Sequence, residues 1–299
     1  MKIFHAIIIL LLISPALLAQ DDIMNITDDS IRQVYYDKAM RDRNIFRPKH
    51  FEISEDDAIK LADRRPSFAV YRDTYFVTGA PLNREITNNS ADATFQISIR
   101  QRLTKSVLPL KTFAYLTYSQ KSFWNIYAES SPFKDTNYNP GLGLGKYIFY
   151  KNKLVGAAFV QVKHESNGRD KDDSRSWNYL SLSMKYFFNA RFNLSGEFWA
   201  PWVDGENNKD LLDYRGIGFI SINYTSNKQR WWLSADMNPK KGFGINTNLT
   251  AGFKISDRSN QYLFAKFYQG YGESLLDYNK YTMNIRVGIC IKPDFYNVF

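Results

Sequence analysis

The sequence is poor in cysteine, histidine and long apolar segments. Of its 299 residues only Cys290 is a cysteine, which excludes an intramolecular disulfide and a cysteine-based metal cluster. Histidine occurs 3 times, once in the N-terminal segment, which argues against a histidine-rich catalytic rim. Beyond the N-terminus no run of about 20 apolar residues follows, which excludes a bundle of transmembrane helices.

The N-terminus holds the single long apolar segment. Lys2 precedes an apolar stretch from Ile3 to about Ile13, and small and turn residues follow up to Ala19. This order is typical of a secretory signal, so we predict a signal peptide over residues 1–19. The alternative is an N-terminal membrane anchor, for which the stretch is short.

Positive charge exceeds negative charge, with a formal net charge of +9 and a pI near 9.3. The lysines and arginines are scattered, and the sequence shows no basic block or nucleic-acid-binding motif. We therefore predict no nucleic-acid partner. On an exported β protein, such charge faces anionic lipid head groups or lines a lumen.

The chain is rich in aromatic residues, at 16%, yet its mean hydropathy is −0.41. Apolar and polar residues alternate, as in TFQISIRQ, where Phe95, Ile97 and Ile99 share one face of a strand. Similar stretches recur between turn-rich segments and give eleven or twelve strands from Phe68 onward. This pattern predicts an all-β fold, with a lead-in over residues 20–67 and an antiparallel barrel over residues 68–299.

A soluble β sandwich would alternate in the same way. Three features favour a barrel of the outer membrane. These are the export signal, the terminal aromatic Phe299, and tryptophans near the expected strand ends, namely Trp124, Trp177, Trp231 and Trp232.

Polar residues end two neighbouring lipid-facing rows. In AAFVQVKHES, His164 and Ser166 follow Val160 and Val162 on one face, and in the next strand Asn178 precedes Leu180 on the same kind of face. If residues 167–175 form the connecting loop, His164 lies opposite Asn178 and Ser166 lies opposite Ser176. Side chains directly opposed across two strands have Cβ atoms about 5 Å apart, within hydrogen-bond reach.

These three side chains are the components of a nucleophilic hydrolase. Ser166 would be the nucleophile, His164 the base that takes its proton, and Asn178 the group that orients the imidazole. Gly168, beside Asn167, can present a backbone N–H to a developing oxyanion. The plainer alternative is a set of polar residues that merely lie in the head-group zone.

Three segments of the chain resemble the outer membrane phospholipase A family. They are KHESNGRDKDDSRSWN, YSQKSFWN with ESSPFKDTNYNP, and FYQGYGESLLDYN. The resemblance implies a twelve-stranded outer-membrane barrel that hydrolyses acyl esters of phospholipids and lysophospholipids. It places the catalytic roles on Ser166, His164 and Asn178.

The same resemblance implies Ca²⁺ and an active homodimer. The family pattern makes the Ser130 hydroxyl of one subunit, with the Arg169 carbonyl and the Ser174 hydroxyl of the other, the calcium ligands, and hard oxygen ligands suit this ion. It also places Gln120 at the dimer interface. From the residues alone, Asp135, Asp172 and Asp173 would have been the calcium candidates.

Two alternatives remain open at this point. One is a non-enzymatic outer-membrane pore or structural barrel, which predicts no esterase activity. The other is a different barrel enzyme, such as a protease or a lipid A-modifying enzyme. Glu165 stands where the family pattern has Asp, and its position predicts a side chain that faces the lumen.

Overall fold

The computed structural model describes residues 51–293, apart from residues 53, 152, 190, 203–205, 227–228 and 257–258. The predicted signal peptide, the lead-in up to residue 50 and the terminal Phe299 lie outside these residues. Within them, no helix is long and apolar enough to cross a membrane.

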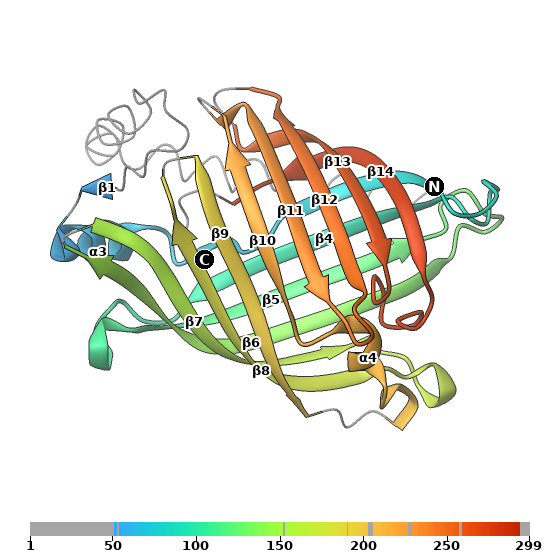
Figure 1. Cartoon of the computed structure of the whole chain (residues 1–299), viewed down its shortest axis with the longest axis horizontal. Helices are drawn as coiled ribbons and strands as arrows, with labels where there is room; N and C mark the ends of the chain where they lie inside the picture. The colour runs from blue at the N-terminus through green and yellow to red at the C-terminus, as the bar shows by residue number, and fades with distance from the viewer. Residues whose placement is uncertain are drawn as a thin grey trace.

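Twelve antiparallel strands in the described chain close into a barrel (Figure 1). Each strand pairs with the next, β7 pairs with β8, and β14 closes the wall by pairing with β3. The twelve-stranded barrel that the sequence predicted is therefore confirmed. The strands are β3 (Thr74–Pro81), β4 (Asp92–Arg102), β5 (Phe113–Trp124), β6 (Phe133–Tyr150), β7 (Lys153–Ser166), β8 (Ser176–Phe187), β9 (Phe192–Trp202), β10 (Gly218–Thr225), β11 (Trp231–Pro239), β12 (Ile245–Lys254), β13 (Gln261–Gly270) and β14 (Thr282–Ile291).

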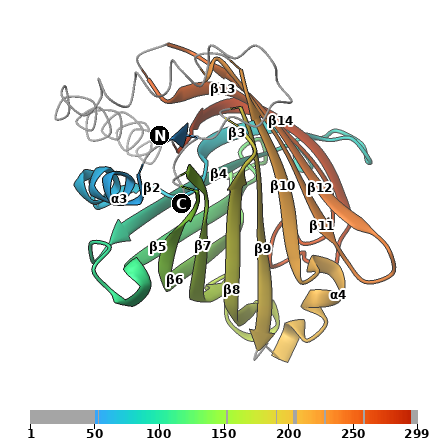
Figure 2. The ribbon, with the colours of Figure 1, turned by 60° about the vertical axis from the view of Figure 1, so that its left-hand side comes forward.

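Shorter elements lie at the ends of the barrel. Strand β2 pairs with β4, and β1 pairs with the first residues of β7. The helices α3 and α4 lie at opposite ends of the barrel (Figures 1 and 2). These elements are β1 (Phe51–Glu52), α3 (Glu55–Arg64), β2 (Phe68–Val70), α4 (Leu211–Arg215) and the 3₁₀ turns η2 (Pro109–Lys111), η3 (Lys171–Asp173) and η4 (Glu206–Asn208).

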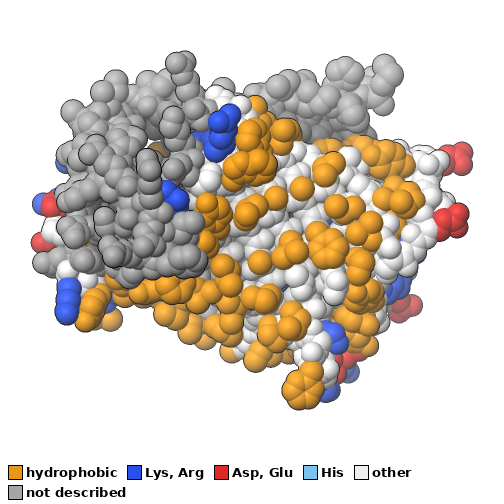
Figure 3. All heavy atoms as spheres, turned by 45° about the horizontal axis from the view of Figure 1, so that its top comes forward, with side chains coloured by type: hydrophobic (Ala, Val, Ile, Leu, Met, Phe, Trp, Pro, Cys, Tyr) orange, Lys and Arg blue, Asp and Glu red, His pale blue; other side chains and the backbone are white. Residues whose placement is uncertain are grey.

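The outer wall is apolar, as the alternation predicts. Val162, Leu182 and Met184 keep 54%, 45% and 52% of their surface exposed, although they lie in the middle of strands. Figure 3 shows one face of the wall covered by hydrophobic side chains, with charged groups confined to its edges. Such a surface is stable only when lipid covers it.

The interior of the barrel is polar and crosslinked. The Lys163 ammonium lies 2.8 Å from the Glu197 carboxylate, which also accepts from the Ser181 hydroxyl at 2.6 Å. Arg72 forms a second ion pair with Glu197. A buried charge is tolerated when it is paired and hydrogen-bonded, so these partners stabilise side chains that the strand pattern forces inward.

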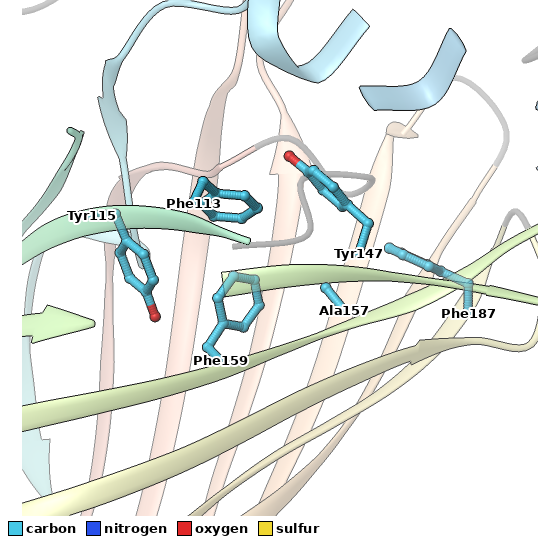
Figure 4. Close-up of a cluster of buried hydrophobic side chains, with 6 residues drawn as sticks. All are labelled: Phe113, Tyr115, Tyr147, Ala157, Phe159 and Phe187. Carbon is cyan, nitrogen blue, oxygen red and sulfur yellow. The ribbon is translucent and has the colours of Figure 1, made fainter. Parts of the chain in front are cut away.

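One end of the interior is aromatic and is covered by part of the lead-in. Phe113, Tyr115 and Phe159 pack together there with other buried side chains (Figure 4). Ile59 of α3 packs against this cluster, and Asp63 of α3 forms an ion pair with Arg102. The last part of the predicted lead-in is therefore packed onto the barrel.

The four tryptophans lie at strand ends, as predicted, but they do not form a uniform lipid-facing belt. Trp177 and Trp232 keep only 0% and 6% of their surface exposed, whereas Trp231 keeps 48%. Trp177 stacks on Tyr179 with ring centroids 4.0 Å apart. The period of two that brings Asn178 to the outer wall turns its neighbour Trp177 into the lumen.

Candidate active site on the outer wall

Strands β7 and β8 form the hairpin that carries the predicted site. His164 lies opposite Asn178 and Ser166 lies opposite Ser176, so the predicted register is confirmed. The buried Asn167 closes the loop between the strands. Its backbone N–H donates to the Arg175 carbonyl oxygen, and its side-chain oxygen accepts from the Arg175 N–H, both at 3.0 Å. The loop is thereby held compact beside Ser166.

The imidazole of His164 contacts the amide of Asn178. His164 Nδ1 lies 2.8 Å from Asn178 Oδ1. Because an amide oxygen only accepts, Nδ1 carries the hydrogen in this contact and Nε2 is left as the acceptor. This tautomer is the one that a general base needs.

Ser166 lies on the same outer face as His164, two residues along β7. Tyr138 of β6 stands opposite Ser166, and its ring lies against Gly168. Gly168 has a φ of +66°, and a Cβ there would come within 3.0 Å of Tyr138 Cε2. The backbone conformation favours glycine, and any larger residue would also have to displace the Tyr138 ring slightly.

A groove of about 480 Å³ runs along the outer wall to this site. His164 and Asn178 are among its polar lining residues, and Leu116, Leu142 and Val162 are among its apolar ones. An imidazole and an amide thus open onto an apolar channel that faces lipid. This arrangement suits a substrate with a polar ester and long hydrocarbon chains.

Contacts from inside the barrel support the strand that carries His164 and Ser166. Glu165, which the sequence placed in the lumen, is buried there and accepts from Trp177 Nε1 at 3.0 Å. It also forms an ion pair with Arg215, which ends α4, at 3.0 Å. Asn139 Nδ2 donates to the His164 carbonyl oxygen at 2.8 Å. No signal in the sequence pointed to Asn139 or Arg215.

The predicted calcium ligands lie at the loops of the same end of the barrel. Ser130 is exposed in the turn between β5 and β6, while Arg169 and Ser174 lie in the β7–β8 loop. Among the described residues, no group of three His, Cys, Asp or Glu side chains could hold a metal ion.

The acidic residues suggested by the sequence alone are placed differently. Asp135 is buried and accepts from the Asn137 side chain and the Leu276 N–H. Asp172 and Asp173 are exposed in η3. Asp135 thus serves to tie strand β6 to the loop between β13 and β14.

Gln120 lies on the outer wall of β5 within a short polar row. Its Oε1 accepts from the Tyr118 hydroxyl at 3.0 Å, and its Nε2 lies 3.4 Å from Ser122 Oγ. Tyr118 also lines the groove that ends at His164. The polar row is therefore adjacent to the candidate site.

Comparison with known proteins agrees with this fold. The family model described as phospholipase A1 matches residues 66–291. The chain belongs to the phospholipase A1 family. It is therefore an outer-membrane phospholipase, and the alternative of a non-enzymatic barrel is set aside.

Individual relatives show the extent of the similarity. The phospholipase A1 of Salmonella typhimurium is 30% identical over 67% of this chain and 70% of its own length. A putative phospholipase A1 of Neisseria meningitidis is 27% identical over 67% of this chain, which spans only 54% of that relative.

Solved structures of the family share the fold. Outer membrane phospholipase A from Escherichia coli superposes with a TM-score of 0.68 at 26% identity, over 77% of this chain and 100% of that one. A Salmonella typhi outer membrane phospholipase, solved as a dimer with bound calcium, has a TM-score of 0.67 at 24% identity, over 78% of this chain and 93% of its own. A variant of the Escherichia coli enzyme, described as an active-site mutant, carries alanine in place of an asparagine.

Proposed function

We propose that this phospholipase hydrolyses the acyl ester bonds of phospholipids and lysophospholipids with Ser166, His164 and Asn178. The observation that carries the proposal is the 2.8 Å contact between His164 Nδ1 and Asn178 Oδ1, on the same outer face as Ser166. It lies at the end of an apolar groove, where a lipid ester would meet it. The asparagine in the active site of the Escherichia coli relative supports the role of Asn178.

The reaction proceeds by two acyl transfers. His164 Nε2 takes the proton of Ser166 Oγ as this oxygen bonds to the ester carbonyl carbon. The ester C–O bond then breaks, and His164 returns that proton to the departing glycerol oxygen of the lipid. Water, deprotonated by His164, attacks the acyl-enzyme, releases the fatty acid and restores Ser166. The Gly168 backbone N–H would stabilise the oxyanion in both halves.

Asn178 fixes the imidazole in this scheme without a buried negative charge. A carboxylate in its place would stabilise the imidazolium more strongly, but an ionised group beside lipid costs more to desolvate. The neutral amide keeps the Nδ1–H tautomer at a lower cost.

The β5–β6 turn and the β7–β8 loop offer oxygen atoms that suit calcium. The Ser130 hydroxyl, the Arg169 carbonyl and the Ser174 hydroxyl would hold it, with the last two on the loop that Asn167 closes. Three neutral oxygens and waters are hard ligands of the kind Ca²⁺ takes. When bound, the ion would polarise a water beside the oxyanion position.

A homodimer would join these ligands and cover the groove. The proposed ligand set draws Ser130 from one subunit and the β7–β8 loop from the other. Gln120 would bond across the interface, since its Nε2 contact to Ser122 is long at 3.4 Å and a buried amide gains from a second partner. Because Tyr118 lines the groove and contacts Gln120, a second barrel at this face would form the other wall of the acyl-chain cleft.

The test measures fatty-acid release from mixed phospholipid–detergent micelles by the refolded full chain, with calcium or with a chelator. Ser166→Ala should abolish release, while Ser176→Ala, which removes the hydroxyl directly opposite on β8, should retain it. Release that persists in Ser166→Ala would refute the nucleophile. Release that is equal in calcium and chelator would refute the metal.

A further inference from the structure

The pairing of β6 with β7 is interrupted beside His164. It stops after Tyr138 and resumes at Gly141, so that Pro140 stands opposite His164. On its other side, β6 pairs with β5 without a break through Pro140. In a regular ladder, the backbone N–H of the residue at position 140 would donate to the His164 carbonyl oxygen. Proline has no N–H, so this hydrogen bond between β6 and β7 is missing.

The side chain of Asn139 replaces this donor. Its Nδ2 donates to the His164 carbonyl oxygen at 2.8 Å and to the Tyr179 hydroxyl at 3.0 Å. Tyr179 directly follows Asn178 on β8 and stacks on Trp177. A single amide on β6 therefore reaches across to the backbone of His164 and to the neighbour of Asn178.

We infer that Asn139 is a positioning residue that fixes the backbone of His164 where Pro140 cannot. This rests on the proposed role of His164 as the base. Asn139 lies on the lumen side of the wall, so it touches neither the lipid nor the reacting atoms. Without its amide, the His164 carbonyl oxygen loses its donor and β7 can shift at that residue. A displacement of about 1 Å in a catalytic group can lower the rate about 100-fold.

The role of Asn139 is tested by removing its side-chain amide and then supplying a backbone N–H at position 140 instead. Asn139→Ala should lower kcat at least about tenfold and leave KM within about twofold of wild type. Adding Pro140→Ala restores a backbone N–H opposite His164, so the double variant should regain most of the lost kcat. Pro140→Ala alone should keep the wild-type kcat, which is the quantity compared because Pro140 also lines the groove. Asn193→Ala is the matched control, because Asn193 is a buried lumen amide on β9 that accepts from Asn223 Nδ2 at the end of the barrel opposite to the site.

The outcomes separate this inference from the proposed function. An active wild type, an inactive Ser166→Ala and an unchanged Asn139→Ala would overturn the inference alone. A kcat loss that Pro140→Ala does not restore would also overturn it, since the backbone donor would then not be what Asn139 supplies. An inactive wild type would overturn the proposed function itself.

Folding of the variants is checked by the shift in mobility of the refolded barrel on unheated gels. If Asn139→Ala does not refold, Asn139→Leu, with and without Pro140→Ala, makes the same comparison with a side chain of similar volume. Rescue of folding and activity together by Pro140→Ala supports the inference. Refolded double variants without activity would overturn it.

Discussion

The contact between His164 and Asn178 makes Asn178→Ala the most informative single change. The substitution removes the acceptor 2.8 Å from His164 Nδ1 and leaves Ser166, the groove and the loop in place. The imidazole is then free to rotate and to carry its hydrogen on either nitrogen. We expect a lower kcat, because the amide holds the base in place.

The size of the loss follows from the charge that develops on the imidazole. In the ground state the bond joins two neutral groups, whereas in the transition state it joins an amide oxygen to an imidazolium. Hydrogen bonds to charged groups contribute about 1.5–3 kcal/mol. Since about 1.4 kcal/mol corresponds to a tenfold change in rate, kcat should fall by about 10- to 150-fold.

Initial rates of fatty-acid release at saturating calcium provide the assay, with dimer formation followed by crosslinking. Asn178→Asp keeps an oxygen acceptor and should stay within about tenfold of wild type. Activity of Asn178→Ala within twofold of wild type would refute the orienting role. A loss as complete as that of Ser166→Ala would refute the magnitude, because it would require more than one hydrogen bond.

Three further predictions concern the metal and the buried charges. Chelation of calcium should lower the rate about 100-fold, as expected for the loss of one oxyanion-stabilising group. It should also convert the crosslinked dimer to monomer, and an unchanged dimer fraction would contradict a calcium site at the interface. Glu197→Gln leaves the Lys163 ammonium without its buried counter-charge and should lower the free energy of unfolding by about 3–5 kcal/mol in a urea titration, whereas Glu129→Gln, at an exposed turn, should have no measurable effect. Burial alone would raise the pKa of Glu273, in the loop between β13 and β14, but the charge of Arg286 and nearby lysines holds it at about 2, below its ordinary 4.5. A carboxyl whose pKa is lowered in the folded state stabilises the fold at pH values above its unfolded pKa. The contribution of Glu273 to the free energy of unfolding, about 3 kcal/mol, should therefore be lost as the pH falls from 4.5 to about 2. Glu273→Gln should make the free energy of unfolding less dependent on pH over this range.

The sequence by itself determined which side chains face lipid and which face the lumen. Because side chains alternate along a strand, the apolar row that ends in His164 and the row that begins with Asn178 could be assigned to one face. The short loop between them then set the register that brings these two residues together. The same alternation turned Trp177 inward, although tryptophan at a strand end would by itself suggest a lipid-facing belt.

Only the tertiary structure decided what lies behind that hairpin. Closure of the barrel places Arg215 of α4 against Glu165, a contact between residues 50 positions apart that no local pattern encodes. It also aligns β6 with β7 so that Pro140 faces His164 and Asn139 supplies the missing donor. Local alternation fixes the face of each side chain, but partners across the lumen and between strands depend on closure and register, which are properties of the whole barrel.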